Sequence, residues 1–342
     1  MADPNMERYS RQMRFAPIGA RGQARLGASG VLIVGMGALG AVLASHMTRA
    51  GVGLVRFADR DYVEKSNLQR QMLYDEDDAA SGLPKAIAAE RKLARVNSEV
   101  RLEPVVADVT AANVEALMEG VDVVLDGTDN FRTRLLLNDA CFRHGVPFVY
   151  GGAVSSQGMT ATFVPGETSC LRCLIGSEPD GAGQTCDTIG VVSPIVDIVA
   201  SFQAVEALKL LVGDAESRRR SLLSLELWRH QLFEMRLAPP KASCPTCGEA
   251  PTFPSLEIEA DDATTLCGRE TVQIRAPRPF ELDRLEARLS AVCPAVERNP
   301  FLLRATLPEG ERLVLFPDGR ALVQGTEDIG RAKSLFDRYI GG

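Results

Sequence analysis

The sequence lacks the features that direct a chain to a membrane or to nucleic acid. Its 342 residues carry 38 Lys and Arg against 45 Asp and Glu, so the formal charge is −7. Because there is no basic excess, we expect neither nucleic acid nor an anionic membrane as the main partner. No apolar run approaches the roughly 20 residues that span a bilayer, and the first 15 residues lack the apolar segment of a signal peptide. We therefore expect a cytoplasmic protein without a membrane partner.

Histidine is scarce, and the cysteines are not spaced as in a secreted protein. The three histidines, His46, His144 and His230, have no companion ligand, so packing explains them best. Four of the eight cysteines form two C-x-x-C pairs, Cys170 with Cys173 and Cys244 with Cys247. In a reducing compartment such pairs serve metal or redox chemistry, not structural disulfides.

The length is comfortable for two domains. Residues 1–150 alternate strands and helices, which predicts a doubly wound, Rossmann-like α/β sheet with ligands at the carboxyl ends of its strands. Strands are expected at 31–35, 54–59, 101–109, 121–126 and 146–152, and helices at 38–50, 83–96, 110–119 and 130–144.

The pattern changes after about residue 153. Two stretches, GMTATFVP and SLLSLELW, predict an antiparallel extension of the sheet, separated by an apolar helix over 193–212. A segment rich in Pro, Gly and Cys then closes a first domain at residue 250. Residues 255–342 read as strand, helix, strand, a strand pair and a final helix, which favours a small α+β docking module of the ferredoxin-like kind.

GMGALG, between a strand and a helix, matches the dinucleotide-binding fingerprint. Gly35 permits a tight turn, Gly37 lets the backbone approach phosphate, and Gly40 lets the helix pack on the strand. Asp59 closes the second strand and can accept hydrogen bonds from ribose hydroxyls. Taken alone, these features also fit a generic NAD or FAD site.

The stretch SNLQRQ, just past Asp59, favours a triphosphate instead. Arg70 and the later Lys85 can reach phosphate oxygens, and Asn67 and Gln69 can donate to a polyphosphate chain. Cationic clamps of this kind stabilise the charge that develops in nucleotidyl transfer. Each cation taken alone is equally compatible with a solvated surface position.

DGTDN follows the fourth strand and offers a second group of polar side chains. Asp129 suits Mg²⁺, which takes one or two protein carboxylates together with phosphate oxygens. The alternative is that Asp129 caps the helix that opens at Asn130. Asp126 is expected to be buried and structural.

The two C-x-x-C pairs suit a tetrahedral zinc with Zn–S distances near 2.3 Å. The 70 residues between the pairs exceed the usual gap of a zinc ribbon, so the metal would staple two distant loops. Four cysteine ligands leave no open coordination position, which indicates a structural role. The alternative is two separate redox pairs.

These motifs together resemble the ThiF/MoeB family of ubiquitin-activating-type (E1-like) adenylyltransferases. The resemblance rests on RYSRQ (8–12), VLIVGMGALG (31–40), SNLQRQ (66–71), LPK (83–85), DGTDN (126–130), CLRC, QTCDTIGV and CPTC. It implies that MgATP donates AMP to the C-terminal glycine of a ubiquitin-like or sulfur-carrier protein. It also implies zinc at the four cysteines and a homodimer.

By position, the resemblance implies that Asp59 binds the ribose and that Asn67, Arg70 and Lys85 bind the phosphates. It gives Asp129 to Mg²⁺, with Asn130 beside it at the nucleotide. Arg11 resembles an arginine that reaches across a dimer interface into the partner's ATP site. Ala38, also at the nucleotide, stands where relatives often have glycine.

Cys186, in GAGQTCDTIGV, pairs with no other cysteine and resembles a family cysteine that takes part in acyl or sulfur transfer. Its thiolate would attack the acyl-adenylate. The neighbouring Asp187 disfavours the thiolate, so an inert cysteine is the alternative.

Residues 255–342 show no rhodanese-like loop around a cysteine, so any sulfur comes from elsewhere. The terminal Gly341-Gly342 follows a predicted helix, which favours a helix ending in glycine over a fused substrate. The function expected is therefore adenylation of a carrier protein. The alternatives are a catalytically silent nucleotide-binding partner and, less favoured, an NAD(P) or FAD oxidoreductase.

Overall fold

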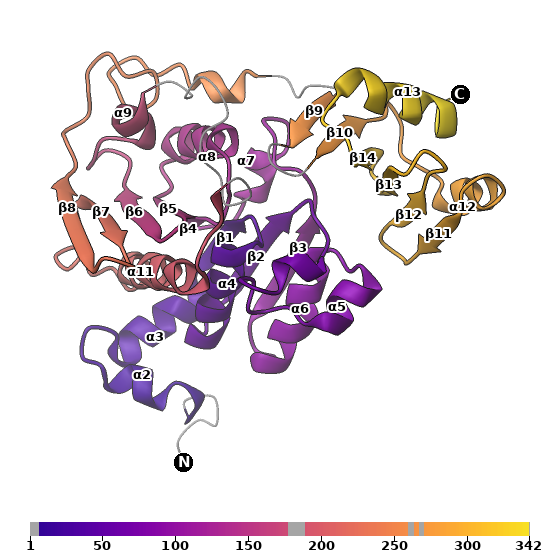
Figure 1. Cartoon of the computed structure of the whole chain (residues 1–342). Coiled ribbons are helices and arrows are strands. Elements are labelled where there is room, and N and C mark those ends of the chain that lie inside the picture. The colour runs from indigo at the N-terminus through magenta and orange to yellow at the C-terminus, as the bar shows by residue number, and fades with distance from the viewer. Residues whose placement is uncertain (1–6, 177–188, 259–262, 267–269, 342) are drawn as a thin grey trace. The chain divides into compact units, whose positions relative to one another are not determined.

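The computed structural model describes residues 7–176, 189–258, 263–266 and 270–341 (Figure 1). Packing divides the chain into two units, Met1–Glu259 and Ala260–Gly342. Each unit has a sheet and a hydrophobic core of its own. No helix in the described parts of the chain is both long and apolar enough to cross a membrane.

The first unit is built on an eight-stranded sheet in the order β3-β2-β1-β4-β5-β6-β7-β8. The first five strands pair in parallel and the last three are added antiparallel. The parallel strands are β1 (Gly30–Val34), β2 (Leu54–Asp59), β3 (Arg101–Val106), β4 (Val123–Asp126) and β5 (Phe148–Val154). The antiparallel strands are β6 (Gln157–Phe163), β7 (Ser221–Glu226) and β8 (Gln231–Arg236). The predicted Rossmann-like sheet and its antiparallel extension are confirmed.

Helices cover both faces of this sheet (Figure 1). One face carries α3 (Gly19–Ala28), α4 (Ala38–Ala50), α6 (Lys85–Val96) and α11 (Ser193–Val212), with the short α2 (Ser10–Arg14) packed on α3. The other carries α7 (Val114–Leu117), α8 (Phe131–His144) and α9 (Leu171–Ile175). Two single turns, η1 (Lys65–Asn67) and η2 (Pro254–Leu256), and helix α5 (Glu76–Ser81) complete the elements named in this unit.

Two predicted helices have the expected bounds because their sequences leave little choice. The helix predicted at 38–50 starts after a glycine and stops at Gly51, which is left-handed with φ 77°. The apolar helix predicted at 193–212 is α11, which contacts α4, α3 and strands β4 to β6 and is therefore apolar on several sides. The helix expected at 110–119 is reduced to the four residues of α7.

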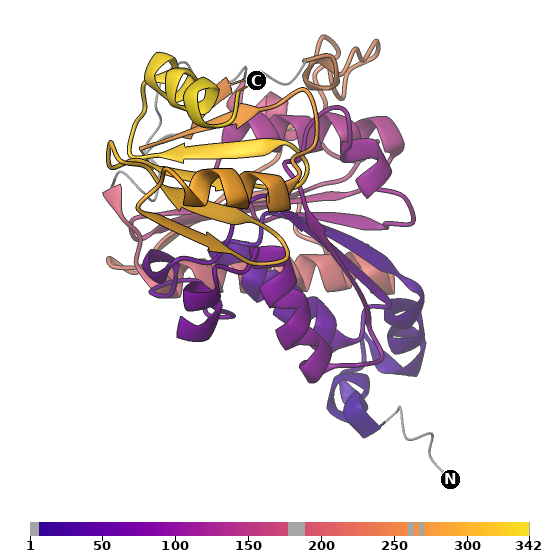
Figure 2. The ribbon, with the colours of Figure 1, turned by 90° about the vertical axis from the view of Figure 1, so that its right-hand side faces the viewer.

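The second unit is a six-stranded sheet in the order β11-β12-β13-β14-β10-β9 with two helices on one face. Figure 2 shows α12, in orange, lying in front of the strands of this sheet. The strands are β9 (Ala263–Leu266), β10 (Thr271–Arg275), β11 (Ala295–Arg298), β12 (Leu303–Thr306), β13 (Arg312–Leu315) and β14 (Arg320–Gln324). The helices are α12 (Leu282–Ser290) and α13 (Ile329–Tyr339).

The expectation of a small α+β unit holds, but a ferredoxin-like arrangement does not. That arrangement splits a β-α-β unit so that a later strand inserts between its two strands. Here β11, β12, β13 and β14 are joined by short turns, so successive strands are neighbours, and every pairing of the sheet is antiparallel. The tight turn at FPDGR, with Gly319 at φ 89°, is what keeps β13 beside β14.

Candidate functional site

The glycine-rich turn between β1 and α4 is shaped by close backbone contacts. Gly35 has a φ of 87°, and a Cβ on Gly40 would lie 1.8 Å from the carbonyl oxygen of Gly35. Gly37 differs, because a Cβ built there meets, among the described residues, only Nε2 of Gln71 at 3.9 Å. Gly37 is also the N-cap of α4, so the unpaired N–H groups of the first helical turn, which Ala38 begins, open onto this space. The turn has the shape and polarity of a phosphate cradle.

Asp59, at the end of β2, supports this turn. Its Oδ2 accepts a hydrogen bond from the Met36 N–H at 2.6 Å, and its Oδ1 accepts one from the Asp61 N–H at 2.6 Å. Burial raises the pKa of Asp59, while the Lys85 ammonium acts in the opposite direction. Each carboxylate oxygen still has a lone pair for a ribose hydroxyl, so the geometry is compatible with the predicted ribose contact.

Lys85 is the first residue of α6 and is 3% exposed. Its Nζ pairs with Oδ2 of Asp61 at 3.3 Å, because a buried ammonium needs a counter-charge. The Tyr74 hydroxyl lies 2.8 Å from the Met36 carbonyl oxygen and 3.2 Å from that of Lys85, which ties the start of α6 to the glycine-rich turn. The pairing role of Asp61 was not predicted from the sequence, where it is one more acid after a strand.

The stretch 66–71 reaches the glycine-rich turn through its last residue. Gln71 is 3% exposed, and its Oε1 is buried with no hydrogen-bond partner among the described residues. Its Nε2 is the atom nearest to Gly37, so Gln71 turns an amide N–H donor toward the cradle. The predicted ligand Asn67 is buried, and its Oδ1 accepts a hydrogen bond from the Glu64 N–H at 3.1 Å, which shapes the turn η1.

Gln69 and Arg70 lie nearer the surface of the same stretch. The side-chain amide of Gln69 lies 3.5 Å from the carbonyl oxygen of Val191, and Nη1 of Arg70 donates to the Ser66 carbonyl oxygen at 3.1 Å. Their long side chains extend from the loop that supplies Gln71. The structure therefore carries three predicted phosphate ligands, Asn67, Gln69 and Arg70, on one loop.

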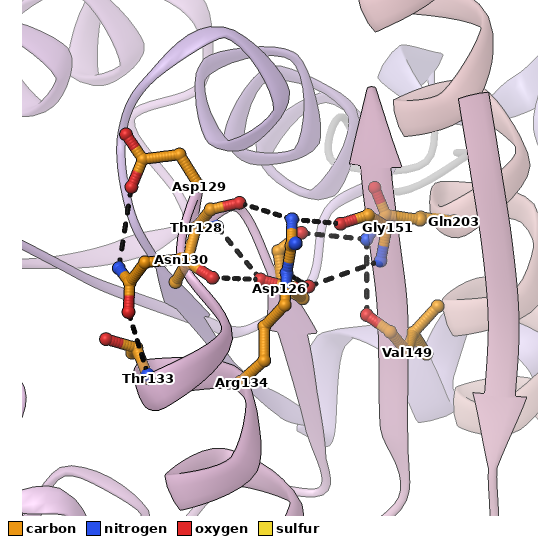
Figure 3. A network of polar contacts seen from close by, with 9 residues as sticks. All are labelled: Asp126, Thr128, Asp129, Asn130, Thr133, Arg134, Val149, Gly151 and Gln203. Carbon is orange, nitrogen blue, oxygen red and sulfur yellow. Dashed lines mark hydrogen bonds and ion pairs between the residues drawn. The ribbon is translucent and has the colours of Figure 1, made fainter. Parts of the chain in front are cut away.

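DGTDN leaves β4 at the same edge of the sheet (Figure 3). Asp126 is fully buried, as expected. The N-cap of α8 is Asn130, whose Oδ1 accepts a hydrogen bond from the Thr133 N–H at 2.8 Å. The capping alternative for Asp129 is therefore wrong: the residue stands one place before the cap, is exposed, and accepts a hydrogen bond from Nδ2 of Asn130 at 3.4 Å.

Strand register brings these groups together. Val34 on β1 is level with Ala58 on β2 and with Asp126 on β4, so the three strands end side by side. The Gly127 N–H donates to the Val34 carbonyl oxygen at 2.8 Å, so the loop after β4 packs on the glycine-rich turn. The cradle, the acidic end of β2 and the DGTDN loop thus share the carboxyl edge of one sheet.

Arg11 is the predicted nucleotide ligand that does not lie at this edge. Arg11 is exposed on α2. The next residue, Gln12, donates a hydrogen bond from Nε2 to the Ala50 carbonyl oxygen at 3.0 Å, so α2 lies near Ala50. Ala50 ends α4, and Gly37 precedes its start. A helix of 13 residues is about 20 Å long at 1.5 Å per residue, so Arg11 lies far from the cradle of its own chain. Cys186 lies outside the described residues.

Four cysteine sulfur atoms meet in one cluster. The Sγ atoms of Cys170, Cys173, Cys244 and Cys247 all lie within 4.8 Å of one another. Sγ of Cys170 is 3.6 Å from that of Cys244, and Sγ of Cys173 is 3.4 Å from that of Cys247. Tetrahedral zinc with Zn–S bonds near 2.3 Å places its sulfur atoms about 3.8 Å apart, so the donors fit that metal. The cross-pair contacts contradict two separate redox pairs.

One buried carboxylate on α8 joins the two cysteine turns. Asp139 accepts hydrogen bonds from Arg172 Nη2 at 2.8 Å, from the Thr246 hydroxyl and from the Ser255 N–H at 2.9 Å. Arg172 lies between the cysteines of the first pair and Thr246 between those of the second. Asp139 therefore holds both turns against α8, a role that the sequence did not indicate.

A doubly wound sheet with a glycine-rich turn at its carboxyl edge and a buried lysine beside it is the arrangement of a nucleotide-binding α/β domain, and this domain also carries four cysteines that could hold a metal. The chain belongs to the ThiF family, whose family model matches residues 9–246. The resemblance inferred from the sequence motifs is confirmed.

Relatives and solved structures agree with this assignment. The chain is 48% identical to the sulfur carrier protein ThiS adenylyltransferase of Bacillus subtilis over 338 residues, which cover 98% of this chain and 99% of the relative. It is 40% identical to the SAMP-activating enzyme E1 of Haloferax volcanii over 245 residues, 71% of this chain and 89% of that relative. The crystal structure of E. coli MccB with ATP shares the fold, with a TM-score of 0.61 at 22% identity, over 70% of this chain and 74% of that one.

Proposed function

We propose that this protein is an ATP-dependent adenylyltransferase that activates the C-terminal glycine of a ubiquitin-like sulfur-carrier protein. The observation that carries the proposal is the cradle: open space at Gly37, the amide nitrogen of Gln71 facing that space, and the buried lysine Lys85, whose backbone carbonyl is tied to the same turn through Tyr74. The B. subtilis relative, named for adenylation of the carrier ThiS and aligned with 98% of the chain, supports the choice of substrate. An oxidoreductase would leave Lys85 and the loop 66–71 without a role.

In this proposal the residues of the carboxyl edge divide the nucleotide between them. Asp59 accepts from the ribose, while Asn67, Gln69, Arg70 and Lys85 hold the phosphates, with the backbone of 35–40 beneath them. Asp129 contributes a carboxylate to Mg²⁺, and Asn130 orients Asp129. Bound Mg²⁺ would neutralise the charge on the phosphates during transfer.

The reaction joins the two substrates in one displacement. A terminal carboxylate oxygen of the carrier attacks the α-phosphorus of ATP, the bond to the bridging oxygen of the β-phosphate breaks, and pyrophosphate leaves. Lys85 and Arg70 stabilise the negative charge that collects on the phosphate oxygens. The product is a carrier acyl-adenylate. Cys186 stays a proposed thiol for a following acyl transfer, in which AMP leaves.

We assign the docking of the carrier to the edge strand β8. All six residues of β8 are exposed, and β7 ends and β8 begins at the edge of the sheet where β5 ends. Trp228, in the intervening turn, is 78% exposed, and Phe233 and Met235, two residues apart and therefore on one face of β8, add exposed apolar side chains. An apolar surface that starts at the catalytic edge suits a partner whose C-terminal tail must enter that edge.

A homodimer, zinc and a docking role for the second unit complete the proposal. Arg11 lies far from the cradle of its own chain, which supports the proposal that it serves the site of a second copy. Zinc is assigned to the four cysteines on the fit of their sulfur atoms. Such a thiolate site favours a reducing compartment, which supports a cytoplasmic location.

The second unit, Ala260–Gly342, is also covered by the match to the B. subtilis relative. We propose that it docks a protein partner.

The test is ATP–pyrophosphate exchange with Mg²⁺ in the presence of purified B. subtilis ThiS. We expect exchange that requires ThiS and is lost in Asp129→Ala. ThiS that lacks its last glycine serves as the matched control, and it should support no exchange. Measurable ATP binding without exchange would contradict the proposal.

A further inference from the structure

One arginine of α8 is buried in a network that the nucleotide chemistry does not require. Arg134 is 7% exposed. Its Nε donates to Oδ2 of Asp126 at 2.9 Å, and its Nη2 donates to the carbonyl oxygens of Thr128 at 2.7 Å and Gly151 at 3.0 Å (Figure 3). The guanidinium carbon also lies 5.2 Å from the centroid of the Tyr150 ring. The side chain is therefore fixed by contacts from β4, β5 and the loop between β4 and α8.

Asp126, the partner of Arg134, is bonded just as fully. Its Oδ1 accepts from the Thr128 N–H at 2.9 Å and from the Thr128 hydroxyl at 2.7 Å. From α11, the side-chain amide of Gln203 donates to the Asp126 carbonyl oxygen at 2.9 Å and to that of Val149 at 3.2 Å. Desolvation offsets most of the Coulomb attraction of a buried ion pair, so such a pair adds little net stability. The ion pair between Arg134 and Asp126 instead fixes the positions of β4, β5 and the loop after β4 relative to one another.

The network closes a loop in the chain. Asp126 and Arg134 are eight residues apart, and Asp129 and Asn130 stand between them. The same loop packs backbone to backbone on the glycine-rich turn, since a Cβ on Gly127 would lie 2.4 Å from the carbonyl oxygen of Gly35. A shift of the Arg134 guanidinium would therefore move both the Asp129 carboxylate and the wall of the cradle.

We propose that Arg134 is a positioning residue for adenylation, which holds the loop 126–130 so that Asp129 meets the metal-bound phosphates in the cradle. This inference rests on the proposed function. Arg134 acts without touching the substrate: it is 7% exposed, and its Nε and Nη2 donate to Asp126, Thr128 and Gly151.

The test compares Arg134→Lys with Arg56→Lys in the full chain. Lysine keeps the charge but loses the planar fork that serves several acceptors at once. Arg56, on β2, is a matched control, because it too binds one carboxylate, that of Glu103 at 2.7 Å, and two carbonyl oxygens, those of Leu117 at 2.6 Å and Glu119 at 2.8 Å. Those carbonyls precede β4, at the opposite end of the strand from the DGTDN loop.

Each variant is assayed by ThiS-dependent pyrophosphate exchange across a Mg²⁺ titration, together with its melting temperature. A displacement near 1 Å costs about 100-fold in rate, so we expect Arg134→Lys to lower kcat about 10- to 100-fold and to raise the Mg²⁺ concentration for half-maximal exchange. Arg56→Lys should keep the wild-type kcat and the wild-type Mg²⁺ requirement, while its melting temperature falls about as much as that of Arg134→Lys. Equal losses in the two variants, or an unchanged Mg²⁺ requirement, would overturn the inference. Wild-type protein without exchange would instead overturn the proposed function, and this inference with it.

A second pair of variants covers the case in which Arg134→Lys does not fold. Thr128→Val replaces the hydroxyl that donates to Asp126 with a methyl group of similar size, whereas Thr128→Ser keeps the hydroxyl. We expect Thr128→Val to raise the Mg²⁺ requirement in the same direction by a smaller factor, and Thr128→Ser to restore it. A folded Thr128→Val protein with the wild-type Mg²⁺ response would contradict the positioning role.

Discussion

Replacing Lys85 with methionine tests the electrostatics of the nucleotide edge. The ammonium is 3.3 Å from a carboxylate oxygen of Asp61 and is nearly inaccessible to solvent. At an effective dielectric constant of about 20 this pair is worth about 5 kcal/mol of Coulomb energy. Because methionine no longer pays the desolvation of an ammonium, we expect a net loss of about 2 to 3 kcal/mol in the free energy of unfolding at neutral pH.

The loss should depend on pH through Asp59. Burial raises the folded-state pKa of Asp59 above its unfolded value, and Lys85 limits that rise. A carboxyl group with a raised folded-state pKa gives full stability below its unfolded pKa of about 3.9, and this stability is lost as the pH rises through the folded-state pKa. Since Lys85→Met raises the folded-state pKa further, the difference from wild type should be small near pH 4 and should grow toward pH 7.

The assay is urea unfolding of both proteins between pH 4 and pH 8, with Lys92→Met as the control. Lys92 lies on the same helix and pairs with Asp75 and Asp78. The side chain of Asp75 is 57% exposed and that of Asp78 is 10% exposed, so the control should lose about 1 to 2 kcal/mol, less than Lys85→Met. A Lys85→Met loss that is independent of pH, or no larger than that of Lys92→Met, would refute the electrostatic coupling of Lys85 to Asp59.

Three further predictions concern the cradle, the staple and the dimer. Gly37→Ala should weaken ATP binding in calorimetry with little loss of melting temperature, whereas Gly40→Ala should lower the melting temperature strongly because its Cβ would lie 1.8 Å from a backbone oxygen; the reverse order would contradict the cradle. Asp139→Asn should weaken zinc retention against a chelator about 10- to 100-fold, since it removes the carboxylate that holds both cysteine turns; unchanged retention would show that the thiolates alone organise the site. Arg11→Ala should lose exchange and regain it when co-expressed with Asp129→Ala, because the mixed dimer has one complete site; no recovery would contradict an arginine supplied across a dimer.

Much of the fold follows from local signals in the sequence. The turn around Gly35 and Gly40 was predictable because a strand, three glycines and a helix have few other arrangements, and the four-cysteine cluster was predictable because each C-x-x-C turn presents two thiols on one side. In the second unit the elements were largely visible, but their pairing was not. The order of strands depends on the turns that join them, and the strand 295–298 carried too little apolar pattern to be recognised.

The residues that support the site were harder to find than those that form it. Arg134 is one of several arginines on α8, and only the tertiary structure shows that it is buried against Asp126. Asp61 and Asp139 look like ordinary acids, because the partners that define them are distant in sequence. The sequence allowed Asp129 as the N-cap of α8, whereas the structure has Asn130 in that position. The difference is one residue, which is smaller than the precision with which a helix boundary can be predicted from sequence.

The central claim is tested most directly by looking for the product on the carrier. The full-length protein is incubated with ATP, Mg²⁺ and B. subtilis ThiS without any sulfur donor, and the intact mass of ThiS is measured. We predict a ThiS species carrying AMP on its C-terminal glycine, which is absent with Lys85→Met and absent when ThiS lacks that glycine. Unmodified ThiS beside hydrolysed ATP, or AMP attached elsewhere on ThiS, would contradict adenylation of the carrier terminus.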